Sequence, residues 1–177
     1  MKISGILDES IVDGPGIRVV VFAQGGLHNC FSCQNPDTHD MNGGYEITVD
    51  ELYKKTRDII EKNKILSGVT FSGGDPFFQS KEFAELGEKL KELNLSIITY
   101  TGFTFEELLE KSKVDENINN LLKITDILVD GRYIDDEKDL TLCYRGSRNQ
   151  RLIDVKNSID AKKSILWQES FKRYLTK

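Results

Sequence analysis

Residues 17–26 read Ile17-Arg-Val-Val-Val-Phe-Ala-Gln-Gly-Gly26, a β-branched run that ends at two glycines. This is the pattern of a buried strand that enters a loop. Strand-like runs at 68–72, 95–100 and 126–129 also end at glycines, and segments with helical spacing separate them. Strands that alternate with helices predict an α/β fold with a mostly parallel sheet and outer helices. Because the units are too few for a closed barrel of about 250 residues, we expect a partial, incomplete β/α barrel.

Capping boxes mark two of the helix starts. Thr48 with Glu51, and Thr104 with Glu107, have the spacing at which a threonine and a glutamate satisfy the first backbone amides of a helix. The spacing of apolar residues predicts helices at 49–62, over 83–93, from 104 onward and at 115–123. Two late strands are expected at 151–155 and 164–167.

Length and charge restrict the classes of function. The 177 residues fit one domain spanning residues 1–177. The chain has 29 acidic and 24 basic residues and a net charge of −5, which argues against nucleic acid as a partner. No apolar run approaches the roughly 18 residues of a membrane-spanning helix, so no membrane partner is expected. Residues 1–25 lack the features of a secretory signal, and we expect a cytoplasmic protein with reduced cysteines.

Both histidines and two of the three cysteines lie between residues 24 and 40. Cys30 and Cys33 form a C-x-x-C pair, a spacing at which two thiolates can bind one zinc ion or part of an iron–sulfur cluster. His28 and His39 could complete a zinc site with them, although four donors within twelve residues are tightly spaced for one ion. A thioredoxin-like redox pair is a further alternative. Local spacing leaves these alternatives open.

Two glycine-rich turns accompany the cysteine loop. Asp13-Gly-Pro-Gly-Ile-Arg18 precedes the first β-branched run, and turn rules alone predict a tight turn followed by a surface arginine. Ser72-Gly-Gly-Asp-Pro76 follows the next strand, where glycines let a ligand approach the backbone and Asp75 can accept hydrogen bonds from a cation. The loops after parallel strands meet at one edge of a sheet, so we expect one site formed by 25–36, 73–76, 101–103 and 130–133.

Six segments in order give the chain a family resemblance. Between about residues 10 and 156 it resembles the activating proteins of anaerobic ribonucleoside-triphosphate reductases, a branch of the radical S-adenosylmethionine enzymes. The resemblance is carried by residues 13–18, 22–36, 70–76, 100–103, 130–133 and 145–151. It implies a radical S-adenosylmethionine type of partial barrel that holds a [4Fe–4S] cluster. One electron from the cluster would cleave S-adenosylmethionine, and the 5′-deoxyadenosyl radical would install a glycyl radical on the reductase.

The resemblance also implies roles for individual residues. Cys30 and Cys33 would ligate the cluster, and Asp75, with Gly73 and Gly74, would bind the methionine amine. Further cofactor contacts would come from the residues that flank or follow these motifs, namely Ser32, Cys33, Gln34, Thr101 and Asp130. The implied partners are the glycyl-radical subunit of the reductase and a one-electron donor such as flavodoxin or ferredoxin.

The chain departs from the family at Gly26. The family pattern C-x-x-x-C-x-x-C places its first cysteine at this position, and glycine offers no ligand atom. His28, an added thiol or Cys143 could substitute, although burial statistics favour Cys143 as an ordinary buried cysteine. A cluster-deficient protein that only docks on the reductase is therefore a rival interpretation.

A basic cluster lies near the end of the resemblance. Arg145, Arg148 and Arg151 are separated by small and polar residues. Most such runs are solvated surface. Because this segment belongs to the family pattern, we expect it to hold a partner loop or to line the site.

Overall fold

The computed structural model describes residues 1–26, 38 and 40–168. This part of the chain contains one seven-stranded sheet with the strand order β3-β1-β2-β4-β5-β6-β7. The strands are β1 (Lys2–Ser10), β2 (Ile17–Ala23), β3 (Tyr45–Glu46), β4 (Leu66–Gly73), β5 (Ser96–Tyr100), β6 (Ile127–Asp130) and β7 (Arg151–Asp154). The helices are α1 (Val49–Lys62), α2 (Ser80–Lys91), α3 (Phe105–Ser112), α4 (Glu116–Ile124) and α5 (Val155–Ala161).

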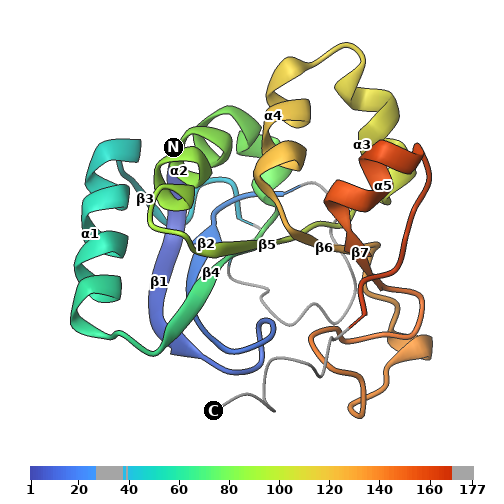
Figure 1. The fold of residues 1–177 in the computed structure, drawn as a ribbon, viewed down its shortest axis with the longest axis horizontal. Helices are drawn as coiled ribbons and strands as arrows, with labels where there is room; N and C mark the ends of the chain where they lie inside the picture. The colour runs from blue at the N-terminus through green and yellow to red at the C-terminus, as the bar shows by residue number, and fades with distance from the viewer. Residues whose placement is uncertain (27–37, 39, 169–177) are drawn as a thin grey trace.

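The sheet is mixed, with a parallel centre. Strands β2, β4, β5 and β6 pair in parallel, whereas β1 pairs antiparallel with β2 and β3, and β7 pairs antiparallel with β6. The predicted α/β fold with a mostly parallel sheet and outer helices is confirmed. The sheet curves without closing into a barrel, and the helices lie along its outer side (Figure 1). The β1–β2 loop and residues 131–150 lie on the inner side (Figure 1).

Local sequence signals account for the helices. Both predicted capping boxes form, since Thr48 and Thr104 each accept the backbone amide of the glutamate three residues later. The apolar helix faces pack on the sheet, where Phe71 of β4 meets Phe83 of α2 with ring centroids 5.0 Å apart. Both phenylalanines are fully buried. Among the residues that the structure describes, no helix combines the length and apolar character needed to span a bilayer.

Several elements differ from expectation, and neither β3 nor α5 was predicted. Strand β1 was not predicted, because two register shifts against β2 break the alternation of buried and exposed residues. Residues 164–167 do not form the predicted strand and make a single bridge, Ile153 to Leu166. The predicted strand at 151–155 ends at Asp154, whose side chain accepts the amide of Asn157 and caps α5.

Arg18 is buried rather than exposed, so the prediction of a surface arginine was wrong. Its guanidinium lies inside the sheet and donates five hydrogen bonds, to Pro15 O, Thr70 Oγ1, Val69 O, Ser96 O and Ser96 Oγ. Gly14 and Gly68 leave room for it, because a Cβ at either position would collide with the arginine side chain. Burial lowers the pKa of Arg18 to about 10, so the group stays charged at neutral pH. The Asp-Gly-Pro-Gly-Ile-Arg segment therefore holds three strands together.

Candidate functional site

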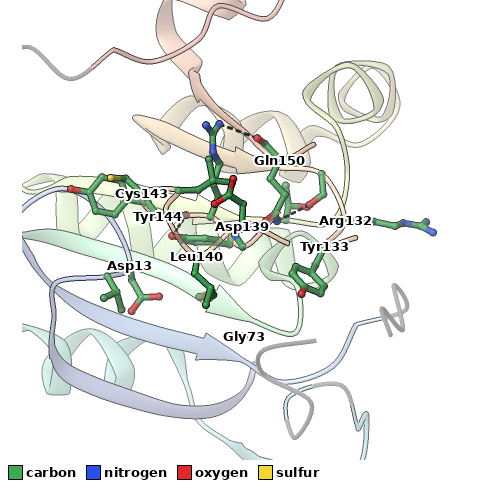
Figure 2. A pocket seen from close by; sticks show the side chains of 18 of the residues that line it. Asp13, Gly73, Arg132, Tyr133, Asp139, Leu140, Cys143, Tyr144 and Gln150 are labelled. Carbon is green, nitrogen blue, oxygen red and sulfur yellow. Dashed lines mark hydrogen bonds between the residues drawn. The ribbon is translucent and has the colours of Figure 1, made fainter. Parts of the chain in front are cut away.

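A cavity of about 570 Å³ opens at the carboxyl ends of the central strands. Its base is formed by residues that follow β4, β5 and β6, namely Gly73, Gly74, Thr101, Gly102 and Gly131. Figure 2 shows Asp13, Gly73, Tyr133 and Leu140 around this space, with the side chain of Arg132 extending away from it. The expected convergence of 73–76, 101–103 and 130–133 is confirmed. The volume is in the range of pockets that hold small molecules and cofactors.

Two further segments complete the cavity, and of their residues sequence reasoning assigned only Arg145 and Gly146 to the site. One is the β1–β2 loop, through Ile11, Val12 and Asp13. The other is residues 139–146, which we call the strap. Their exposed apolar residues give no periodic signal, so only the fold brings them to the cavity. Ile11, Val12 and Leu140 are 71%, 70% and 84% exposed, which makes the rim of the cavity apolar.

The strap is held by a network of hydrogen bonds. Gln150 Oε1 accepts the amides of Gly146 and Ser147, and Gln150 Nε2 donates to the carbonyl oxygen of Gly131. On the sheet side, the Tyr100 hydroxyl donates to the carbonyl oxygen of Tyr144 over 2.7 Å. Burial raises the pKa of Tyr100 above its ordinary value, so the hydroxyl remains a donor at physiological pH.

The glycine turn after β4 packs directly against the end of β2. The amide of Gly74 donates to Ala23 O over 2.9 Å, and the amide of Asp75 donates to Gly25 O over 3.0 Å. A Cβ on Gly74 would overlap the carbonyl oxygen of Gly25, and Gly73 has a φ of +98°. Both glycines are therefore required by the backbone, which here lies open to the cavity.

Asp75 lies behind this backbone and is fully buried. Its Oδ1 accepts the amide of Phe77 at 2.9 Å. Its Oδ2 accepts the hydroxyl of Thr101 at 2.8 Å and the amide of Gly102 at 3.0 Å. Thr101 is also nearly buried. The carboxylate thus connects the loop after β4 with the loop after β5.

Asp130 is also buried, at the end of β6. It accepts the amide of Phe105 at 2.8 Å and both Nε and Nη2 of Arg151. Arg151 also pairs with Glu106, and this hydrogen bond lowers the pKa of Glu106 to about 2. Hydrogen bonds to Asp130 and then to Glu106 raise the pKa of Arg151. Asp130 therefore anchors the first turn of α3 and strand β7 beside the cavity.

The three arginines of the basic cluster do not lie together, and Cys143 lines the cavity with only one of them, Arg145. Arg145 lines the cavity, as expected, and donates to Gln150 O. Arg148 is exposed, and Arg151 belongs to the ion pairs with Asp130 and Glu106. Cys143 is exposed on the strap and lines the cavity, so the expectation that it is buried was wrong. Its position follows from the path of the strap, which no local pattern predicts.

The cysteine loop lies largely outside the described residues. This holds for the predicted ligands and cofactor contacts His28, Cys30, Ser32, Cys33, Gln34 and His39. Gly26 is described, and a Cβ added there would lie 3.2 Å from the carbonyl carbon of Gly74 and 3.3 Å from the amide nitrogen of Asp75. Position 26 therefore faces the glycine turn. Within residues 1–26, 38 and 40–168, no group of three or more histidine, cysteine, aspartate or glutamate side chains could hold a metal ion.

The donor set for a [4Fe–4S] cluster is one thiolate short. Cys30 and Cys33 supply two, and Gly26 supplies none. A cysteine side chain at position 26 would need the Gly74–Asp75 backbone to move by a few tenths of an ångström. The motif therefore offers two cysteine thiolates where the family pattern has three.

Comparisons with known proteins agree with the sequence motifs. Residues 12–153 match the family described as 4Fe-4S single cluster domain. The anaerobic ribonucleoside-triphosphate reductase-activating protein of Vibrio cholerae is 33% identical over 144 residues, which cover 79% of this chain and 89% of that protein. The protein of the same name from Enterobacteria phage T4 is 34% identical and covers 80% of this chain and 86% of its own length.

A second group of relatives is longer. The pyruvate formate-lyase-activating enzyme of Clostridium pasteurianum is 34% identical over 152 residues, which are 83% of this chain but only 59% of that enzyme. The match to an iron–sulfur domain favours an iron–sulfur cluster over zinc in the cysteine loop. From its motifs, its strand-end cavity and these relatives, the chain belongs to the family of anaerobic ribonucleoside-triphosphate reductase-activating proteins.

Proposed function

We propose that this protein is a radical S-adenosylmethionine enzyme that installs a glycyl radical on an anaerobic ribonucleoside-triphosphate reductase. The main support is the cavity at the strand ends, whose base is glycine backbone, in a chain related to activating proteins. The open curved sheet is consistent with a partial barrel of the radical S-adenosylmethionine type. A cluster with bound S-adenosylmethionine would supply a one-electron cleavage that yields a carbon radical.

The chain's own residues would bind the cofactor and exclude water. Gly73, Gly74 and Gly102 let a ligand contact the backbone closely, because no side chain intervenes. Asp75 and Thr101 would keep these loops in place for the methionine end of the cofactor, and Asp130 would do so on the far side. The apolar rim offers a surface that a segment of the reductase could cover while its glycine reaches the cavity.

The proposed function also requires a one-electron donor and a reducing compartment. A flavodoxin or ferredoxin would deliver the electron. The protein would act in the cytoplasm, because a reducing compartment keeps the cluster cysteines as thiolates. Gly26 favours a second candidate function, in which the protein binds the reductase without forming a radical. The two functions differ in whether the cluster assembles.

The test is iron and sulfide content, with an EPR spectrum after anaerobic reconstitution and reduction. The chain is compared with Gly26→Cys, and Val114→Cys serves as the control for an added thiol at a remote, 90% exposed position. A reducible cluster that responds to S-adenosylmethionine in the unmodified chain supports the enzyme, and its loss in Cys143→Ser would identify the third ligand. A cluster only in Gly26→Cys supports the docking protein. No cluster in any variant would refute the radical mechanism.

A further inference from the structure

The carboxylate of Asp75 is enclosed by donors from its own chain. It lines none of the cavity, although Gly73 and Gly74 before it and Thr101 and Gly102 across from it all do. Its side chain has no exposed surface. We propose that Asp75 is a positioning residue that sets the cavity wall through Thr101 and Gly102 and does not contact the methionine amine. This inference rests on the proposed function, since it concerns the binding of S-adenosylmethionine.

Three hydrogen bonds hold Asp75 in this role. The bonds from Phe77 N, Thr101 Oγ1 and Gly102 N measure 2.9, 2.8 and 3.0 Å. Bonds to an ionised carboxylate are about twice as strong as those between neutral groups. Turning the carboxylate toward a ligand ammonium would break them inside a buried region, where unpaired donors are costly. The arrangement therefore favours a role in which Asp75 connects the loops after β4 and β5 over a direct contact between Asp75 and the ligand. We call this connection through Asp75, Thr101 and Gly102 the joint.

Thr101 attaches the loop after β5 to Asp75. Its hydroxyl donates to Asp75 Oδ2 and accepts the amide of Phe103 at 3.1 Å, and with the amide of Gly102 the loop after β5 is attached to Asp75 at two points. The amides of Gly74 and Asp75 attach the loop after β4 to the end of β2. The Asp75 carboxylate thereby couples the loops after β4 and β5, and the ligand would meet the backbone of these loops. Loss of the Asp75 carboxylate should therefore weaken binding of every part of S-adenosylmethionine rather than of its amine alone.

Binding of two ligands distinguishes a positioning role of Asp75 from a direct contact with the methionine amine. S-adenosylmethionine carries the amine and carboxylate, whereas 5′-methylthioadenosine keeps the adenosyl group without them. Binding of each is measured by calorimetry to the anaerobically reconstituted chain and to Asp75→Asn, Thr101→Val and Thr101→Ser. Thr99→Val is the matched control, because Thr99 is buried on β5 two residues before Thr101 and bonds to Thr125 rather than to Asp75.

A positioning role predicts that Asp75→Asn and Thr101→Val weaken both ligands by the same factor, roughly 10-fold for the loss of one bond to a charged group. Thr101→Ser restores binding, and Thr99→Val leaves it unchanged. A loss confined to S-adenosylmethionine in Asp75→Asn, with Thr101→Val unaffected, would show a direct contact with the amine and overturn the inference.

A second measurement separates this inference from the proposed function. If the reconstituted chain bound neither ligand, the cofactor assignment would fail, and amide exchange of Gly102 and Phe77 would then decide the joint. Faster exchange at both amides in Asp75→Asn supports the joint, because both donate to this carboxylate. Unchanged exchange would overturn it.

Discussion

Replacing Arg18 by methionine should strongly destabilise the protein. Methionine retains much of the apolar volume of the arginine stem and removes the guanidinium. All five N–H groups of this guanidinium are bonded, at distances from 2.8 to 3.2 Å. The acceptors come from the β1–β2 loop, β4 and β5, so the change leaves unpaired polar groups in three segments of the core.

The magnitude follows from two opposing terms. Lowering the pKa of Arg18 from 12.5 to about 10 corresponds to a cost of about 3 kcal/mol for burying the charge. Five charge-assisted hydrogen bonds at about 1.5 kcal/mol each exceed this cost. The balance predicts a loss of about 4 kcal/mol in the free energy of unfolding for Arg18→Met. For a chain of this size, that loss lowers Tm by roughly 10 °C.

Urea unfolding followed by circular dichroism measures this loss. The control is Arg57→Met on α1, where ion pairs with Asp58 and Glu61 lie at the surface and each contributes at most about 1 kcal/mol. A loss below about 1 kcal/mol for Arg18→Met, or one equal to that of the control, would refute the reasoning that the buried guanidinium holds the strands together.

Two further predictions concern the surroundings of the cavity. Because Arg151 lowers the pKa of Glu106 from 4.5 to about 2, their pair stabilises the fold above pH 4.5 and is lost as the pH falls from 4.5 to 2. Glu106 is 53% exposed, so solvent screening limits the effect to about 1 kcal/mol, and unfolding of Glu106→Gln should depend less on pH over that interval. An identical pH dependence in wild type and variant would contradict this. Tyr100→Phe removes the bond to Tyr144 O and should loosen the strap by about 1 kcal/mol, seen as faster proteolysis within 139–146. Unchanged cleavage would mean that this bond does not hold the strap.

Local sequence was sufficient to predict four of the helices and strands β2, β4, β5, β6 and β7 in order, but not β1, β3 or α5. The capping boxes at Thr48 and Thr104 form as expected because they involve atoms only three residues apart. The strands at 17–22, 68–72 and 95–100 were recognisable from β-branched runs that end at glycines. The convergence of their loops follows from parallel pairing alone. The family motifs determined the candidate cofactor, since they specify residue types in a fixed order.

Tertiary structure alone decided which of these residues face the cavity. Four of the five hydrogen bonds of Arg18 reach acceptors 51 to 78 residues away, so its burial could not be inferred from the turn that precedes it. The sequence predicts that Asp75 accepts hydrogen bonds from a bound cation, whereas in the fold its carboxylate accepts them from the loop after β5. The strap carries Leu140 and Cys143 to the rim without any periodic pattern. Long-range hydrogen bonds and packing set these positions, because side-chain burial depends on which distant segments the sheet brings together.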